Sequence, residues 1–117
     1  MRALMLLKMS EQVGVPPEPL FAAMDETIKE IEKSITIIDT NGLVPTAEAA
    51  TKIRVTDGKT TVLDGPFAES RELVGGYALV EVDTYEQAVE AARKIIQVHT
   101  DHWPTWEGEA EVRQVMG

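Results

Sequence analysis

Two segments of the chain are apolar on both faces of an extended strand, and this constrains the fold more than any other feature. Successive side chains of a strand point to opposite faces, and in residues 2–9 and 75–82 both faces are then largely apolar. The first segment places Ala3, Met5, Leu7 and Met9 on one face and Leu4 and Leu6 on the other. Both segments therefore predict central strands of a sheet that is covered on its two sides.

A long amphipathic pattern separates the first strand from the middle of the chain. Apolar residues recur at steps of three or four, at Leu20, Met24, Ile28, Ile31, Ile35 and Ile38. Charged residues fill the opposite positions, so the pattern predicts a helix over residues 19–39 that docks one stripe on the sheet. The pair Asn41-Gly42 is expected to end this helix with a left-handed residue.

The second half of the chain carries clear turn and cap signals. Two β-prone runs flank Asp57-Gly58, a favoured pair for a two-residue hairpin turn. Thr84 and Gln87 match a capping box and predict the start of a second helix. Residues 99–108, HTDHWPTWEG, are expected to form a loop, and residues 109–116 alternate as a last strand with one polar face.

The predicted order is strand, helix, hairpin, strand, helix, strand. It indicates an α+β, ferredoxin-like βαββαβ fold with an antiparallel sheet and two helices on one face. A length of 117 residues suits a single domain, residues 1–117. The opposite sheet face then has no element to cover it, and large apolar faces are rare on monomers. We therefore predict a homodimer in which two sheets enclose a shared interior.

The composition excludes several function classes. The formal net charge of −9 disfavours nucleic acid and anionic membranes as partners. The chain has no cysteine, which removes disulfide and thiolate chemistry. The longest apolar run, ALMLL, is too short for a bilayer span or a signal-peptide core, so we expect a cytoplasmic protein. No phosphate loop, nucleophile elbow or dinucleotide fingerprint is present, and no cofactor is expected.

One motif resembles a known family. Asp64-Gly65-Pro66-Phe67, followed by Ala68-Glu69 and Gly75-Gly76-Tyr77, is similar to the DGPF motif of the YCII-related family, and the similarity extends over most of the chain. The resemblance implies a dimeric α/β barrel of ferredoxin-like protomers. That superfamily includes muconolactone isomerase-like enzymes and small cofactor-free monooxygenases, and some DGPF-type members resemble partners of extracytoplasmic-function sigma factors. Residues 69–72 read ESRE, where the family commonly shows a lysine at the third position.

Three residues are candidates for acid–base chemistry. Asp64 is either a general acid or base beside a pocket, or a turn aspartate that accepts a hydrogen bond from the backbone. His99 and His102 suit proton transfer because an unperturbed histidine has a pKa of about 6.5. They are three residues apart and would alternatively share a metal with Asp101, Glu107 or Glu109, but there is no third histidine, and no metal site is predicted.

Six residues are candidates for contact with a ligand. Arg54 and Arg113 would bind a small anionic ligand, or would pair with acids such as Glu111 instead. Phe67, Tyr77 and Trp103 are candidate pocket walls. Glu69 would act with Glu72 as a carboxylate pair, or lie on a solvated turn. Because Trp103 and Trp106 fall in one loop, we expect an interface or a pocket rim there rather than core.

Two functions from different classes remain open. The first is a cofactor-free small-molecule enzyme that moves a proton next to a carbonyl or lactone, or a ligand binder derived from one. The second is a non-catalytic interaction module associated with transcription regulation, for example through a sigma factor. An interior cavity of about 300 Å³ or more would favour the first, and a packed interior would favour the second.

Overall fold

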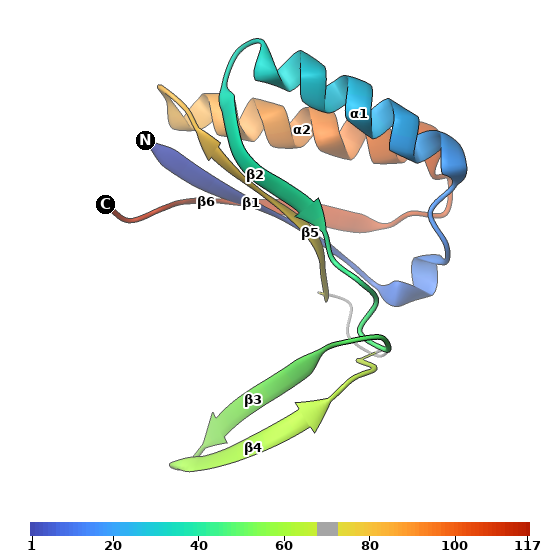
Figure 1. Cartoon of the computed structure of the whole chain (residues 1–117), viewed down its shortest axis with the longest axis vertical. Coiled ribbons are helices and arrows are strands. Elements are labelled where there is room, and N and C mark those ends of the chain that lie inside the picture. The colour runs from blue at the N-terminus through green and yellow to red at the C-terminus, as the bar shows by residue number, and fades with distance from the viewer. Residues whose placement is uncertain (68–72) are drawn as a thin grey trace.

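The computed structural model describes residues 1–67 and 73–117, and it forms two layers with a protruding hairpin (Figure 1). The strands are β1 (Arg2–Met9), β2 (Thr36–Gly42), β3 (Thr51–Thr56), β4 (Lys59–Asp64), β5 (Leu73–Glu81) and β6 (Gly108–Gln114). The helices are α1 (Glu18–Glu32), α2 (Tyr85–His102) and the short 3-10 turn η1 (Glu11–Val13). In the described residues, four strands form one antiparallel sheet in the order β2-β5-β1-β6, and β3 and β4 form a separate pair.

This arrangement confirms the α+β, ferredoxin-like prediction. β1, α1, β2, β5, α2 and β6 make the βαββαβ unit, and both helices cover the same face of the sheet (Figure 1). The β3–β4 hairpin is inserted in the connection from β2 to β5 and projects away from the helices. The core lies between sheet and helices, where Ala3, Val80 and Ala88 are fully buried.

The prediction of a helix over residues 19–39 is wrong in its last third, residues 33–39. α1 ends at Glu32, and residues 36–42 form β2, which pairs with β5. The isoleucine spacing fits a helix, but Thr36, Ile37 and Ile38 are β-branched and favour a strand when a partner is available. The exposed edge of β5 supplies that partner. Asn41 and Gly42 therefore end β2 and do not stop a helix.

The second helix starts as predicted and ends later. The side-chain oxygen of Gln87 accepts hydrogen bonds from the backbone amides of Asp83 (2.8 Å) and Thr84 (3.1 Å), which confirms the capping signal. α2 continues through His102, so His99 and His102 belong to a helix and not to the predicted loop. The loop begins at Trp103.

The sheet face opposite the helices carries apolar residues from both central strands. Leu4 pairs with Leu79 and Leu6 with Tyr77 in the β1–β5 register. They alternate with residues that face the helices, so they point to the other side. Across the described part of the chain, no helix lies over this open face (Figure 1).

Candidate functional site

A hollow of about 800 Å³ lies where α1 meets the end of the sheet from which the hairpin emerges. Its walls come from α1, the second half of β1, residues 10–16, residues 40–46 and the first half of β5. Most of the lining side chains are apolar. Leu20 and Met5 are buried, whereas Phe21, in the next position of α1, keeps 59% of its surface exposed. A concave apolar space of this size is typical of small-molecule sites.

His99 lines the hollow from the last turns of α2 and is only 4% exposed. Its Nδ1 lies 2.8 Å from the carbonyl oxygen of Ile95. Since a carbonyl only accepts, Nδ1 carries the hydrogen and Nε2 of the neutral ring is an acceptor. Among residues 1–67 and 73–117 no hydrogen bond to Nε2 is formed, and no fully buried side-chain nitrogen or oxygen lacks a partner. Nε2 is therefore an unbonded, incompletely enclosed acceptor on a residue that lines the hollow.

Burial sets the protonation of this histidine. Removal of the ring from water lowers the pKa of His99 below its usual value, and the hydrogen bond to Ile95 opposes this only in part. The C-terminal position in α2 favours a cation, but desolvation dominates. His99 is therefore neutral near pH 7, as a general base has to be.

Two tryptophans hold the imidazole in place. The ring of His99 stacks on Trp103 with centroids 6.4 Å apart and lies 4.9 Å from that of Trp106 at a tilt of 45°. Trp103 is 5% exposed and lines the hollow, so the expectation that it avoids the core is wrong. The indole of Trp106 donates to the sulfur of Met9 at 3.4 Å, which fixes the second ring against β1.

Tyr77 of β5 is also part of the lining of the hollow, but its side chain lies on the open sheet face, where it meets two residues that the sequence did not single out for the site. Its hydroxyl donates to Oδ2 of Asp39 at 2.6 Å. The side-chain amide of Asn41 donates to both partners, at 3.2 Å to the tyrosine oxygen and 3.1 Å to Asp39 Oδ1. The sequence predicts a helix through residue 39 with Asn41-Gly42 as its stop, so it gives no reason to expect residues 36–42 beside β5. With a strand there, the alternation of Asp39 and Asn41 is the signal that identifies them.

Asp64 and Phe67 lie outside the hollow, at the root of the hairpin. The exposed carboxylate of Asp64 accepts a hydrogen bond from the Thr51 hydroxyl at 3.1 Å, across the β3–β4 pair. The ring of Phe67 lies beneath the Lys52 ammonium, 4.3 Å from its centroid. Within a single chain these two contacts connect the strands of the hairpin to each other and to Phe67. The acid–base role of Asp64 stays a prediction.

The DGPF turn is tied to the rim of the hollow. The backbone amide of Phe67 donates to the Thr46 hydroxyl at 2.9 Å. Glu11 accepts from the amide of Thr46 at 2.6 Å and from its hydroxyl at 2.8 Å. Gly65 packs so tightly on the Thr46 carbonyl that a β-carbon would overlap it. Glu11 and Thr46 both line the hollow, and sequence reasoning missed both because their contact joins distant segments.

The remaining predicted residues are not brought to the hollow. Arg54 is exposed on the hairpin, and His102 is exposed at the end of α2. Arg113 lies on the open sheet face. Glu69 is outside the described residues. The part of the chain that the structure describes contains no cluster of three or more histidines and acids placed to hold a metal.

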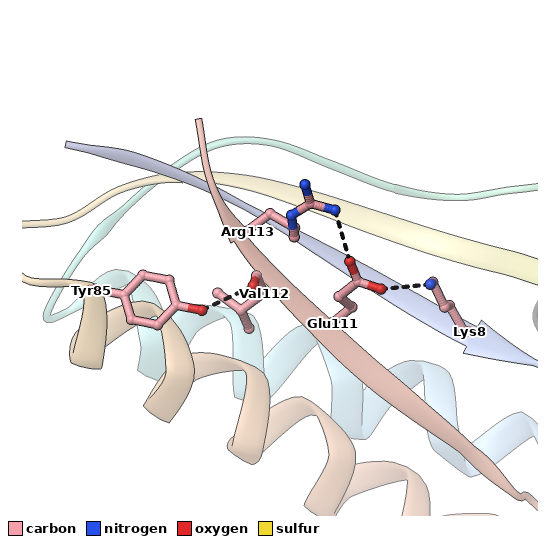
Figure 2. A network of polar contacts seen from close by, with 5 residues as sticks. All are labelled: Lys8, Tyr85, Glu111, Val112 and Arg113. Atoms are coloured by element: carbon pink, nitrogen blue, oxygen red, sulfur yellow. Dashed lines mark hydrogen bonds and ion pairs between the residues drawn. The ribbon is translucent and has the colours of Figure 1, made fainter. Parts of the chain in front are cut away.

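The polar side of β6 forms pairs within the chain (Figure 2). Lys8 Nζ lies 2.6 Å from one oxygen of Glu111, and Arg113 Nη1 lies 3.2 Å from the other. The Lys8 hydrogen bond, followed by that from Arg113, lowers the pKa of the Glu111 carboxyl. The Tyr85 hydroxyl donates to the carbonyl of Val112 at 2.9 Å and ties α2 to the same strand. This geometry matches the intramolecular alternative for Arg113.

Comparison with known proteins assigns the family. The model of the YCII-related domain matches residues 1–116. The chain belongs to the YCII-related family. An uncharacterised protein of Rhizobium meliloti (strain 1021) is 43% identical over 53 residues, which cover 45% of this chain and 42% of the relative. The match therefore spans less than half of that relative's length. Among the described residues of this YCII-related protein, no helix is long and apolar enough to cross a membrane.

Proposed function

We propose that this YCII-related protein binds a small, uncharged carbonyl compound in the hollow and moves a proton on it with His99. The observation that carries the proposal is a buried, neutral imidazole, with an unbonded Nε2, in the lining of an apolar space of about 800 Å³. Of the described residues that line the hollow, none is a lysine or arginine. This lining favours a lactone or ketone over the anionic ligand predicted from Arg54.

The chemistry needs only the groups present in the chain. Nε2 of His99 accepts a proton from the carbon next to the carbonyl, while Nδ1–H stays bonded to Ile95. The same imidazolium then returns the proton to another carbon of the ligand, and the net result is an isomerisation. The rings of Trp103 and Trp106 keep the imidazole in one orientation during both transfers.

Proton exchange tests this function directly. The protein is incubated in D₂O with a panel of small lactones and cyclic ketones, and loss of the α-proton signal is followed by NMR. We expect His99→Gln to retain binding in a thermal-shift assay and to slow exchange by at least about 100-fold. His102→Gln, in an exposed position three residues later, is the matched control and should exchange like the wild type.

Two results would contradict the proposal. Unchanged exchange in His99→Gln would remove the role of the imidazole. Failure of every probe to bind would favour the alternative function, a non-catalytic interaction module linked to transcription regulation.

We also propose that the protein is a homodimer in which a second copy covers the open sheet face. The support is the apolar row of Leu4, Leu6 and Leu79, which no helix covers within residues 1–67 and 73–117. Sheet-to-sheet packing of two copies would bury this row on both protomers at once.

A further inference from the structure

The β3–β4 hairpin, residues 51–64, is called the ribbon below, and it exposes three large aliphatic residues. Ile53, Val55 and Val62 keep 71%, 67% and 62% of their surface exposed. Ile53 lies directly across from Val62, and Val55 is two residues along the same strand, so the three share one face. A two-stranded ribbon is marginal by itself in water. An exposed aliphatic face on such a ribbon indicates that a partner covers it.

The ribbon also differs from the rest of the chain in charge. It carries three basic and two acidic residues, a net charge of +1, whereas the remainder carries eight basic and eighteen acidic residues, a net charge of −10. Lys52, Arg54 and Lys59 lie on the face opposite the aliphatic one, because they pair with Leu63, Thr61 and Thr56. The net charge of the ribbon is therefore opposite in sign to that of the acidic body of another copy, and the two attract each other.

The root of the ribbon is fixed, so the ribbon has a defined direction. Glu11 accepts hydrogen bonds from the amide and hydroxyl of Thr46, and this hydroxyl accepts one from the amide of Phe67. The amide of Gly65 donates to the carbonyl of Ala50 at 2.8 Å. From this root the ribbon extends away from the helices, on the side of the open sheet face (Figure 1). A second copy that packs on the open face would lie beside the ribbon.

We propose that the ribbon is an arm that grips the second copy of this chain, with Ile53, Val55 and Val62 packed against the partner's body. This inference rests on the proposed homodimer and adds the segment that holds it together. In a two-fold dimer the ribbon of each protomer packs on the body of the other. Both ribbons are then covered by the same contact, repeated by symmetry. The basic face of each arm points away from the partner's body, and the net positive charge of the arm attracts the acidic partner at long range as the two copies meet.

Paired variants on the two faces of the ribbon test the arm. The double variant Ile53→Asn with Val62→Asn removes the aliphatic face without adding charge. The matched control, Thr56→Asn with Thr61→Asn, changes the same two strands on the opposite face. We expect sedimentation equilibrium to show a dimer dissociation constant at least about 10-fold higher for the first variant and unchanged for the control. Circular dichroism verifies that both remain folded.

A second measurement uses the absence of cysteine in the natural chain. In Val55→Cys the only thiol lies on the aliphatic face, and its reaction with a disulfide reagent should be slow in concentrated protein and fast after dilution below the dissociation constant. Equal rates of thiol reaction at both protein concentrations would overturn the proposal that the ribbon is an arm. So would a wild-type dimer whose dissociation constant is unaffected by Ile53→Asn with Val62→Asn, although the homodimer itself would then stand. A wild-type chain that stays monomeric at every concentration would overturn both proposals.

Discussion

At the scale of single residues, His99 couples the candidate chemistry to stability. Its ring is neutral because burial lowers its pKa, and it contacts the indoles of Trp103 and Trp106. An unfolded histidine has a pKa of about 6.5 and takes up a proton more readily than the folded one. The unfolded chain therefore binds more protons as the pH falls through this range, and acid lowers the free energy of unfolding.

We predict that His99→Gln reduces this pH dependence. Between about pH 7.5 and pH 5.5 the histidine contributes a loss of at most about 1.4 kcal/mol in the free energy of unfolding, and glutamine contributes none. Urea unfolding at both pH values measures the difference. His102→Gln, at the exposed end of α2, should leave the pH dependence as it is in the wild type. An identical pH dependence in His99→Gln and the wild type would contradict the prediction.

Gly65 is a second residue with a testable effect on stability, because its surroundings leave no room for a side chain. A β-carbon there would overlap the backbone carbonyl of Thr46. This residue is held in place because its amide and hydroxyl donate to Glu11 and its hydroxyl accepts from the amide of Phe67. We predict that Gly65→Ala lowers the free energy of unfolding by about 2–3 kcal/mol in urea titrations. Gly75→Ala should cost clearly less, because its nearest neighbour is the flexible end of Met9. Equal costs for the two variants would show that the contact with Thr46 is not rigid.

At the scale of elements, the start of α2 is specified locally and its packing is specified by the sheet. The side-chain oxygen of Gln87 accepts hydrogen bonds from the backbone amides of Asp83 and Thr84, which would otherwise be unpaired at the helix start. We predict that Gln87→Ala lowers the free energy of unfolding by about 1 kcal/mol, which chemical denaturation would reveal as a lower midpoint. Gln87→Glu keeps an acceptor in the same place and should restore most of the loss. If glutamate gives no recovery, the cost arises from packing and not from the cap.

β2 is the element where local sequence misleads. The steps between Ile28, Ile31, Ile35 and Ile38 fit a helix as well as any other part of the chain. The edge of β5 nevertheless pairs with residues 36–42, and six residues of β2 gain cross-strand partners. The spacing of apolar residues within one short segment contains no information about the unpaired edge of β5, which lies about forty residues further along the chain.

At the scale of the whole molecule, the open sheet face and the ribbon leave the chain with more apolar surface than its own helices cover. We predict that Leu79→Arg, in the middle of the open face, raises the dimer dissociation constant by at least about 100-fold, because a charge would have to be buried without a partner. Analytical ultracentrifugation measures this. Phe21→Arg makes a comparable change at an exposed position on the helix side and should not affect assembly. An unaltered dimer in Leu79→Arg would place the interface elsewhere.

Much of the candidate site depends on contacts that no local pattern contains. His99, Tyr77 and Trp103 were identified from their residue types, and all three line the hollow. Asp64 and Arg54 were chosen by the same reasoning, and they lie on the hairpin because its two strands pair with each other and not with the sheet. Residue chemistry thus identifies candidates, and strand pairing decides which of them meet.

By itself, the sequence determined the two apolar central strands, the hairpin turn at Asp57-Gly58, the start of α2 and the family, because each depends on alternation, turn chemistry or a motif within a few residues. Only the tertiary structure decided that residues 36–42 are a strand, that the hairpin stands apart from the sheet, and that His99 is buried at the hollow. The physical reason is that strand pairing and burial are set by segments far apart in the chain, and their free energies exceed local conformational preferences.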